Sequence, residues 1–395
     1  SQGDCACPAI GQHRSSEVTM PEGDAIHRIA HTFSSLFEGA QVQASSPQGR
    51  FASSAQLIDG HVVVAVRAVG KHMFVAFAAP GLATSVIEQA REIEAEYAAR
   101  LNSAEAVAAL PFTGSSPVWG ERAFPSEESL QWLHIHLGLY GSWRFDADER
   151  TQDVPASIGA PRTNWVATKG HRHAALKWAS YSEDSLYIED NLAAGEARDI
   201  AGQWQAPEPV GQVRLRILSD VAVADVTGPN RCELISDEQR LVTESKLGCD
   251  PLQPGASQEP AMRKRFIELV RARKRPVGEL IMDQSIAAGV GNIYRAEALF
   301  LAGISPMRAG NRLSKARVGQ LWDIICELMT RGLEIGRIDT IRPEDQPDPI
   351  PEGDEELGRW YIYHRSGRPC IKCGTMISEK LMQNRRLFWC SNCQN

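Results

Sequence analysis

Residues 20–24, Met20-Pro21-Glu22-Gly23-Asp24, begin the first segment of the chain that has a clear structural pattern. A proline followed by acidic side chains is typical of a first helical turn, and residues 24–38 continue with apolar side chains at helical spacing. A second interpretation is chemical. If translation began at Met20 and the methionine were removed, Pro21 would carry a secondary amine that can attack an aldehyde-level carbon. Glu22 could then transfer a proton beside it.

The composition is that of a globular protein with an uneven charge distribution. The 395 residues carry a net charge of −7, and their length suggests two or three domains. No apolar run approaches the roughly 20 residues of a membrane span, and no signal peptide is visible. The stretches 81–130 and 146–204 carry −5 and −4, which leaves +2 for the remainder, with basic segments at 263–265 and 271–275. Local basic patches of this kind permit nucleic-acid binding despite an acidic total.

Alternating apolar residues predict a β domain in the first half of the chain. Residues 61–69 and 72–77 predict a hairpin with Lys71 at its tip, where a lysine is ordinarily just solvated. Strand-like sequence resumes at 132–145 and again at 212–226. The two acidic stretches then read as insertions into this domain, and residues 1–19 as a disordered leader.

The second half of the chain predicts helices. A Pro/Gly/Ser-rich linker at 250–260 separates the β domain from helical patterns at 261–274, 278–286, 293–302 and 313–335. Gly289-Val290-Gly291-Asn292 interrupts two of these helices. A glycine turn before a helix N-terminus can offer N–H groups to a phosphate, although many helix pairs are joined by glycine without such a role.

Four cysteines near the C-terminus predict a metal site. Cys370-x2-Cys373 and Cys390-x2-Cys393 have the spacing of a four-thiolate zinc ribbon. We expect one structural Zn²⁺, because four protein ligands leave no position for a catalytic water. Arg385 and Arg386, on the second hairpin of such a ribbon, suit phosphate binding.

Five motifs in this order resemble one family. They are Pro21-Glu22-Gly23, Gly70-Lys71-His72, the segment 136–141 (HLGLYG), Asp283-Gln284 with the glycine turn at 288–292, and the terminal cysteines. Together they resemble the formamidopyrimidine-DNA glycosylase/endonuclease VIII group of repair enzymes, with the actinobacterial endonuclease VIII branch looking closest. The resemblance covers roughly residues 20–80, 132–145 and 205–395.

The resemblance implies an α+β fold in three parts. Residues 20–249 would form a β-sandwich flanked by helices, 250–345 a helix–two-turn–helix domain, and 346–395 a loop and zinc ribbon. The implied partner is double-stranded DNA with a damaged base or abasic site, bound between the halves by a monomer in the bacterial cytoplasm, associated with the nucleoid. The implied activity is removal of oxidised bases, with pyrimidines favoured, followed by strand cleavage through elimination.

The resemblance also implies individual roles. Pro21 would attack C1′ and form a Schiff base, Glu22 would relay protons, and Lys71 and Arg385 would grip phosphate and assist cleavage. Asn292 would bind a backbone phosphate, His136 would contact the DNA, and Lys246 stands where endonuclease VIII has a DNA-contacting arginine. A base inside a duplex must be extruded before it can react, so an apolar wedge and a stacking ring are needed for the gap. Leu139 and Tyr140 offer both; without the family, packing of this pair inside a strand would be the simpler expectation.

Three departures from the family pattern bear on activity. Nineteen residues precede Met20, Ala25 stands where many members have glutamate, and Gly138 replaces a glutamine. An acylated proline nitrogen has no lone pair for attack, so we expect the working protein to begin at Pro21. The alternative is a catalytically silent protein that binds damaged DNA or abasic sites, with Pro21 blocked by the leader.

Overall fold

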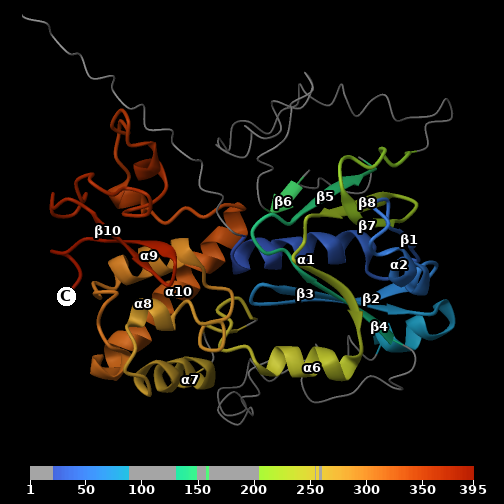
Figure 1. Ribbon diagram of the computed structural model, residues 1–395, viewed down its shortest axis with the longest axis horizontal. Coiled ribbons are helices and arrows are strands. Elements are labelled where there is room, and N and C mark those ends of the chain that lie inside the picture. The colour runs from blue at the N-terminus through green and yellow to red at the C-terminus, as the bar shows by residue number, and fades with distance from the viewer. Residues whose placement is uncertain (1–20, 89–129, 149–156, 160–203, 254, 258–259) are drawn as a thin grey trace, which may run out of the picture.

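The computed structural model describes residues 21–88, 130–148, 157–159, 204–253, 255–257 and 260–395 (Figure 1). The expected leader at 1–19, and most of the two expected insertions at 81–130 and 146–204, therefore lie outside the described residues. The predicted α+β fold is confirmed: β-sheets form the N-terminal half, and helices and a cysteine cluster form the C-terminal half. The predicted divisions at residues 250 and 346 stay predictions.

Two antiparallel sheets and helix α1 (Gly23–Phe37) build the N-terminal half, with α1 running between the sheets in Figure 1. Ile26, Ile29, Phe33 and Phe37 recur on one face of α1 and are buried in one core with residues of both sheets. One sheet has the order β1-β7-β8-β5-β6: β1 (Gln43–Ser45), β7 (Val213–Leu218), β8 (Ala222–Thr227), β5 (Ser142–Ala147) and β6 (Ser157–Gly159). The other has the order β2-β3-β4-β9: β2 (Val62–Val69), β3 (His72–Ala78), β4 (Leu130–His136) and β9 (Arg231–Ile235).

Short helices flank the sheets. They are α2 (Ala52–Ile58) and α6 (Asp237–Ser245), which begins with a capping box formed by Ser236 and Gln239. The predicted hairpin is confirmed, since β2 and β3 pair around Gly70-Lys71. The strand sequence predicted at 132–145 forms two strands: β4 ends at His136 and β5 begins at Ser142, because Gly138 (φ +66°) turns the chain between them.

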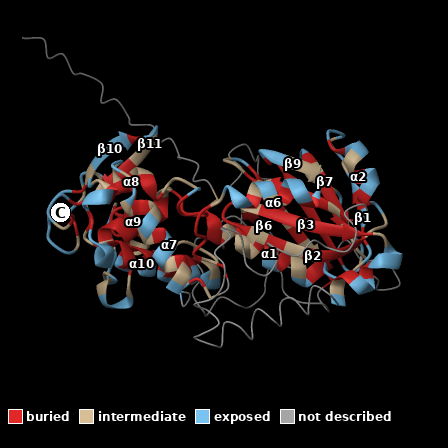
Figure 2. Cartoon of the chain, turned by 90° about the horizontal axis from the view of Figure 1, so that it is seen from below, coloured by how far each residue is buried: buried red, intermediate tan, exposed pale blue. Residues whose placement is uncertain are grey.

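The C-terminal half packs around helices α7 (Pro260–Arg271), α8 (Val277–Leu280), α9 (Asn292–Leu301) and α10 (Lys315–Ile335), with a 3₁₀ turn at Gly310–Arg312. The helix predicted over 278–286 is shorter than expected. Asp283 accepts hydrogen bonds from the backbone N–H and hydroxyl of Ser285, so the chain turns there instead of continuing as a helix. Figure 2 shows buried segments both in the sheets and around these helices.

Residues 343–395 form the C-terminal segment and pack against α9. They contain 3₁₀ turns at Pro343–Asp345 and Glu355–Gly358 and the hairpin of β10 (Ser378–Met382) and β11 (Arg385–Trp389). Glu297 of α9 is fully buried, and its carboxylate accepts hydrogen bonds from the N–H groups of residues 361, 362 and 363 at 2.8–2.9 Å. This carboxylate therefore fixes the C-terminal segment to α9.

Candidate active site

Three glycines from distant parts of the sequence meet at the centre of the site. The N–H of Gly23 donates to the carbonyl of Gly289 at 2.9 Å. A Cβ on Gly23 would lie 2.9 Å from Gly289 Cα, and a Cβ on Gly70 would lie 2.9 Å from Ala288 Cβ. Because any side chain would keep these backbones apart, glycine at these positions allows the start of α1, the β2–β3 turn and the glycine turn to touch.

Glu22 occupies the N-terminus of α9. Its carboxylate accepts hydrogen bonds from the N–H groups of Gly291 (2.9 Å), Ile293 (2.8 Å) and Tyr294 (3.4 Å), across 269 to 272 residues of sequence. Burial raises the pKa of Glu22 to about 7, against the opposing effects of the Lys71 charge and the α9 N–H groups. A carboxyl group with this pKa can donate or accept a proton near neutral pH.

Lys71 is buried, although it stands at the tip of a two-residue turn. Only 8% of it is exposed, so the expectation of a merely solvated lysine is wrong. Burial lowers its pKa, as does the charge of Arg385, while Glu22 raises it. The turn itself is anchored by Asp250, whose carboxylate accepts from the Gly70 N–H at 2.7 Å.

Asp250 is a site-supporting residue that the sequence reasoning missed. It also forms a hydrogen bond with His27 of α1 at 3.0 Å and accepts from the Leu252 N–H at 2.9 Å. Burial by itself would raise the pKa of Asp250, but His27 and these N–H donors hold it below its usual value. One carboxylate thus ties the hairpin turn, α1 and the segment after α6 together.

Pro21 precedes Glu22 directly and is half-buried at the same place. The structure therefore brings Pro21, Glu22 and Lys71 into one site, from positions fifty residues apart in the chain. A free proline amine beside an acid of near-neutral pKa and a buried lysine is an arrangement suited to imine chemistry at an aldehyde-level carbon.

Asn292 and Arg385 lie where α9 meets the β10–β11 hairpin. The side-chain amide of Asn292 donates to the carbonyl of Arg386 at 3.0 Å, and its oxygen accepts from Arg295. Three N–H groups of the glycine turn and the first turn of α9 donate hydrogen bonds to Glu22. These groups are therefore not available for the phosphate binding that the glycine pattern had suggested. The charge of Arg385 contributes to lowering the pKa of both Lys71 and Arg295.

The two arginines of the hairpin differ in their partners. Arg386 forms a two-pronged ion pair with Glu379 of β10, at 2.6 and 2.9 Å. Arg385 is half-buried, and its charge acts on Lys71. Of the two arginines singled out from the sequence, Arg385 is thus the one directed towards the site.

His136, Leu139 and Tyr140 belong to the end of β4 and the turn after it. Tyr140 is 64% exposed and Leu139 half-buried, so packing of this pair inside a strand is excluded. The imidazole of His136 accepts from the Gly138 N–H at 3.1 Å, and its pKa is lowered by burial and then by the charge of Lys71. Exposed Tyr140 therefore projects from the same turn that His136 supports.

Two further histidines beside His136 were not singled out from the sequence. His72 Nδ1 lies 2.8 Å from His134 Nε2, and the rings of His72 and His136 are centred 4.9 Å apart. Burial is the main cause that lowers the pKa of His72 to about 3 and that of His134 to about 4. Their spacing on adjacent paired strands, where His72 faces His136 in register, was the available signal.

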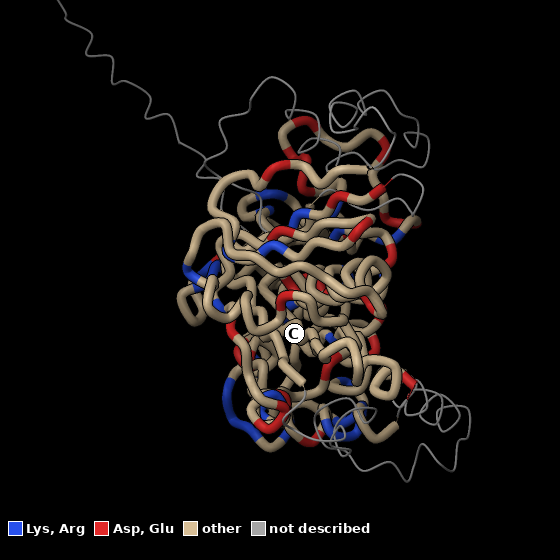
Figure 3. Tube along the Cα trace, turned by 90° about the vertical axis from the view of Figure 1, so that its right-hand side faces the viewer, with Lys and Arg blue, Asp and Glu red and all other residues tan. Residues whose placement is uncertain are grey.

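Lys246 is the exposed C-terminal cap of α6, two residues before Gly248, whose N–H donates to the carbonyl of Gln284 at 2.8 Å. Helix α6 is held by buried ion pairs of Glu244 with Arg67 (3.0 Å) and with Arg240 (2.8 Å). The guanidinium of Arg240 also lies 4.5 Å from the centre of the Trp132 ring. Lys246 is thus presented from a rigid helix end. Figure 3 shows the basic and acidic residues interspersed along the described trace.

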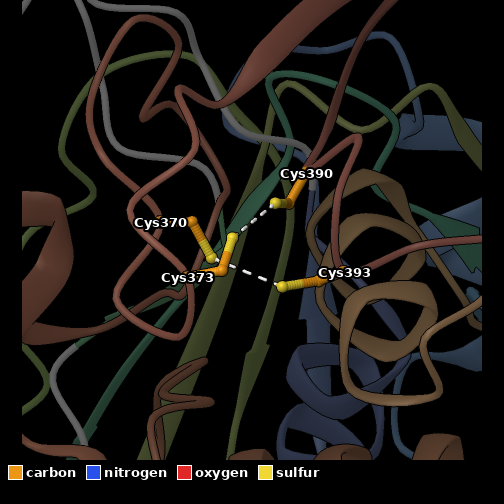
Figure 4. Close-up of side chains that lie close together, drawn as sticks. All are labelled: Cys370, Cys373, Cys390 and Cys393. Carbon is orange, nitrogen blue, oxygen red and sulfur yellow. Dashed lines mark hydrogen bonds between the residues drawn. The ribbon is translucent and has the colours of Figure 1, made fainter.

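The four C-terminal cysteines converge, with all four sulfurs within 4.8 Å of one another (Figure 4). The Sγ–Sγ distances are 3.9 Å for Cys370 and Cys393, and 3.5 Å for Cys373 and Cys390. A tetrahedron with metal–sulfur bonds of 2.3 Å has edges of about 3.8 Å. The donor set and its spacing therefore fit a four-thiolate metal ion.

Comparisons with known proteins agree with this geometry. Residues 247–343 match the family described as the formamidopyrimidine-DNA glycosylase H2TH domain. The chain is 30% identical to Endonuclease 8 1 of Mycobacterium bovis over 95% of its own length and 100% of that protein. It is 31% identical to a formamidopyrimidine-DNA glycosylase of Desulfitobacterium hafniense over 49% of this chain and 68% of that protein.

Solved structures show the same fold. MutM in complex with DNA containing carbocyclic 8-oxo-G has a TM-score of 0.55 at 16% identity, over 95% of this chain and 100% of that one. The MutM protein of Thermus thermophilus has a TM-score of 0.52 at 20% identity, over 95% of this chain and 98% of that one. Among the described residues, no helix is long and apolar enough to cross a bilayer.

Proposed function

Because this chain belongs to the formamidopyrimidine-DNA glycosylase and endonuclease VIII family of DNA-repair enzymes, we propose that it is a bifunctional glycosylase and abasic-site lyase. It removes oxidised bases, pyrimidines by preference, from double-stranded DNA and then cleaves the strand. The observation that carries the proposal is the position of Glu22, which lies next to Pro21, on the N-terminus of α9, with a pKa of about 7.

The first chemical step uses Pro21 as a free secondary amine. Its nitrogen forms a bond to C1′ of the damaged nucleotide as the bond from C1′ to the base breaks, and the proton of the proline nitrogen passes to the departing base. The sugar ring then opens to an iminium. Glu22 gives its proton to the ring oxygen as the ring opens. Glu22, ionised by that transfer, then takes a proton from C2′, and the bond from C3′ to its phosphate oxygen breaks, which cleaves the strand. Lys71 and Arg385 hold the phosphates and assist this elimination.

DNA binding uses the surface around the site. The enzyme extrudes the damaged nucleotide, and Leu139 and Tyr140 enter the gap as wedge and stacking ring. His136, Lys246 and Asn292 contact the backbone, which fixes position without reading sequence. The similarity of Asn292 to the family's phosphate-binding position supports its part, together with its place beside Arg385. We expect a monomer acting on DNA in the bacterial cytoplasm.

The metal site holds one structural Zn²⁺ through Cys370, Cys373, Cys390 and Cys393. Zinc supplies folding free energy to small modules of this kind, and here it would stabilise the hairpin that carries Arg385. Metal analysis of freshly purified protein should give one zinc per chain, and chelation should unfold roughly the last 30 residues. Protein purified without any zinc would contradict this assignment.

Borohydride trapping on abasic-site DNA tests the catalytic proposal. The chain started at Pro21 should form a covalent adduct, while the 395-residue chain should bind the DNA without being trapped. Glu22→Gln in the Pro21-started chain should still bind DNA but lose excision of an oxidised pyrimidine.

Two outcomes would contradict the proposal in different ways. Equal trapping by the intact 395-residue chain, with its mass confirmed, would replace Pro21 by another nucleophile such as Lys71. Binding without trapping by the Pro21-started chain would establish the alternative, a catalytically silent protein that binds damaged DNA.

A further inference from the structure

Asp24 is a second buried carboxyl group in the site, and no step above uses it. It is the second residue of α1 and only 3% exposed. Its Oδ1 is buried, with no hydrogen-bond partner in the described part of the chain. A side chain with an unpartnered oxygen at this depth costs stability, so its presence beside Glu22 needs a reason.

Three helices meet around Asp24. Gly332 of α10 has no side chain, and a Cβ there would lie 3.3 Å from Asp24 Oδ2 and would collide with the hydroxyl of Tyr294. Tyr294 is fully buried on α9, and its own N–H lies 3.4 Å from the Glu22 carboxylate. Asp24 is thus packed at the junction of α1, α9 and α10, with Tyr294 reaching from this junction to Glu22.

Asp24 and Glu22 have different charged neighbours. Arg28, four residues along α1, and His27 favour the ionised form of Asp24, although burial raises its pKa. Glu22 faces Lys71 and the α9 N–H groups, and the negative charge of Asp24 is among the causes that raise the pKa of Glu22. Burial lowers the pKa of Lys71 and the charge of Asp24 opposes that effect, whereas burial and then the charge of Asp24 raise the pKa of Tyr294.

We propose that Asp24 is a positioning residue for acid catalysis, and that its buried negative charge adds to the effect of burial in holding a proton on Glu22 near neutral pH. Asp24 does not touch the substrate. Glu22 and Asp24 are two residues apart in sequence and each is only 3% exposed, and two like charges buried in one site oppose each other's ionisation. With Arg28 beside Asp24, the proton therefore resides on Glu22 until the sugar ring opens and takes it. This inference rests on the proposed function.

The test is the pH dependence of single-turnover base excision in the Pro21-started chain. Glu22 must be protonated to act, so the rate falls as pH rises through its pKa of about 7. This fall in rate is the basic limb of the pH–rate profile. Asp24→Asn removes the like charge and should move the basic limb about one unit towards lower pH. At about pH 8 the variant should be about tenfold slower than the parent, and below about pH 5 the two should agree.

Matched variants separate charge from structure. Asp225→Asn removes another buried carboxylate, one that pairs with Arg216 at 3.4 Å in the five-stranded sheet, and it should leave the profile in place. Asp24→Glu keeps the charge and should restore the parental limb. Arg28→Met lets Asp24 take up a proton and should move the limb in the same direction as Asp24→Asn.

Three results would overturn the inference: an unshifted limb in Asp24→Asn, a shift of the same size in Asp225→Asn, or, if Asp24→Asn fails to fold, an unshifted limb in Arg28→Met. If the parent chain neither excises nor traps, the proposed function has failed instead. The inference is then decided by a ¹³C carboxyl titration of Glu22 in folded Arg28→Met and parent protein, which needs no activity. An unchanged Glu22 pKa would overturn it.

Discussion

Gly291→Ala tests how closely activity depends on the position of Glu22. A Cβ at residue 291 would lie 2.6 Å from Cγ and Oε1 of Glu22, whereas heavy atoms in ordinary contact are about 3.5–4.0 Å apart. The backbone of Gly291 is extended (φ −122°), so alanine introduces no torsional strain there. The carboxylate must therefore move by about 1 Å, and its hydrogen bonds to α9 lengthen.

A displacement of about 1 Å at a reacting group can cost about 10²-fold in rate. We expect single-turnover excision to fall by that factor, with DNA affinity changed by less than about threefold because no phosphate contact moves. Overpacking of this kind should lower the free energy of unfolding by about 1–3 kcal/mol. Quenched-flow kinetics, binding anisotropy and urea unfolding measure the three quantities.

Gly81→Ala is the matched control, since no heavy atom lies within 4 Å of its added Cβ and it stands in a helical stretch. It should keep the parental rate and unfold no more easily than the parent. Full excision by Gly291→Ala, at parental rate, would refute the reasoning that Glu22 acts from its position on α9.

Three further predictions concern other parts of the molecule. His72 and His134 are held neutral in the folded protein, with pKa values of about 3 and 4, below the ordinary 6.5. As pH falls, the unfolded chain therefore takes up protons at these histidines before the folded protein does. The free energy of unfolding should then decrease as pH falls from about 6.5 towards 4. Urea midpoints across that range measure the loss, and a flat series would contradict it. Tyr140→Ala should weaken binding to abasic-site duplex by about tenfold while leaving the urea midpoint in place, because the ring is 64% exposed; a lowered midpoint would mean that the ring is structural. Arg385→Ala should retain its metal yet lose strand cleavage, and normal cleavage on a sequencing gel would show that Arg385 is only a surface residue.

Local patterns in the sequence predicted the local structure well. The apolar spacing over 24–38 predicted helix α1 within one residue, and the hairpin around Gly70-Lys71 follows from β-branched runs on either side of a glycine. The cysteine spacing predicted a cluster of sulfurs that the fold does bring together. In these cases the partners lie close in sequence, or the residue type limits the possible chemistry.

Long-range contacts could not be derived in the same way. Nothing in the sequence near Glu22 indicates that its carboxylate oxygens will accept hydrogen bonds from N–H groups 269 residues away. The burial of Lys71 depends on the touching glycines, which no periodicity reveals. The turn after His136 was overlooked because Leu139 and Tyr140 continue the apolar run, although Gly138 and Gly141 marked it.

Because Glu22 caps α9, the site is complete only when the two halves of the protein have docked. A catalytic acid that belonged to one half of the protein would exist as soon as that half folded. Here the carboxyl group comes from the start of α1, and it is buried against the N-terminus of α9; that burial is what raises its pKa. A chain whose halves have not yet docked has an ordinary, ionised glutamate. If Glu22 is the catalytic acid proposed above, newly made or partly unfolded molecules should not cut sound DNA, since acid catalysis would begin only once the two halves have docked.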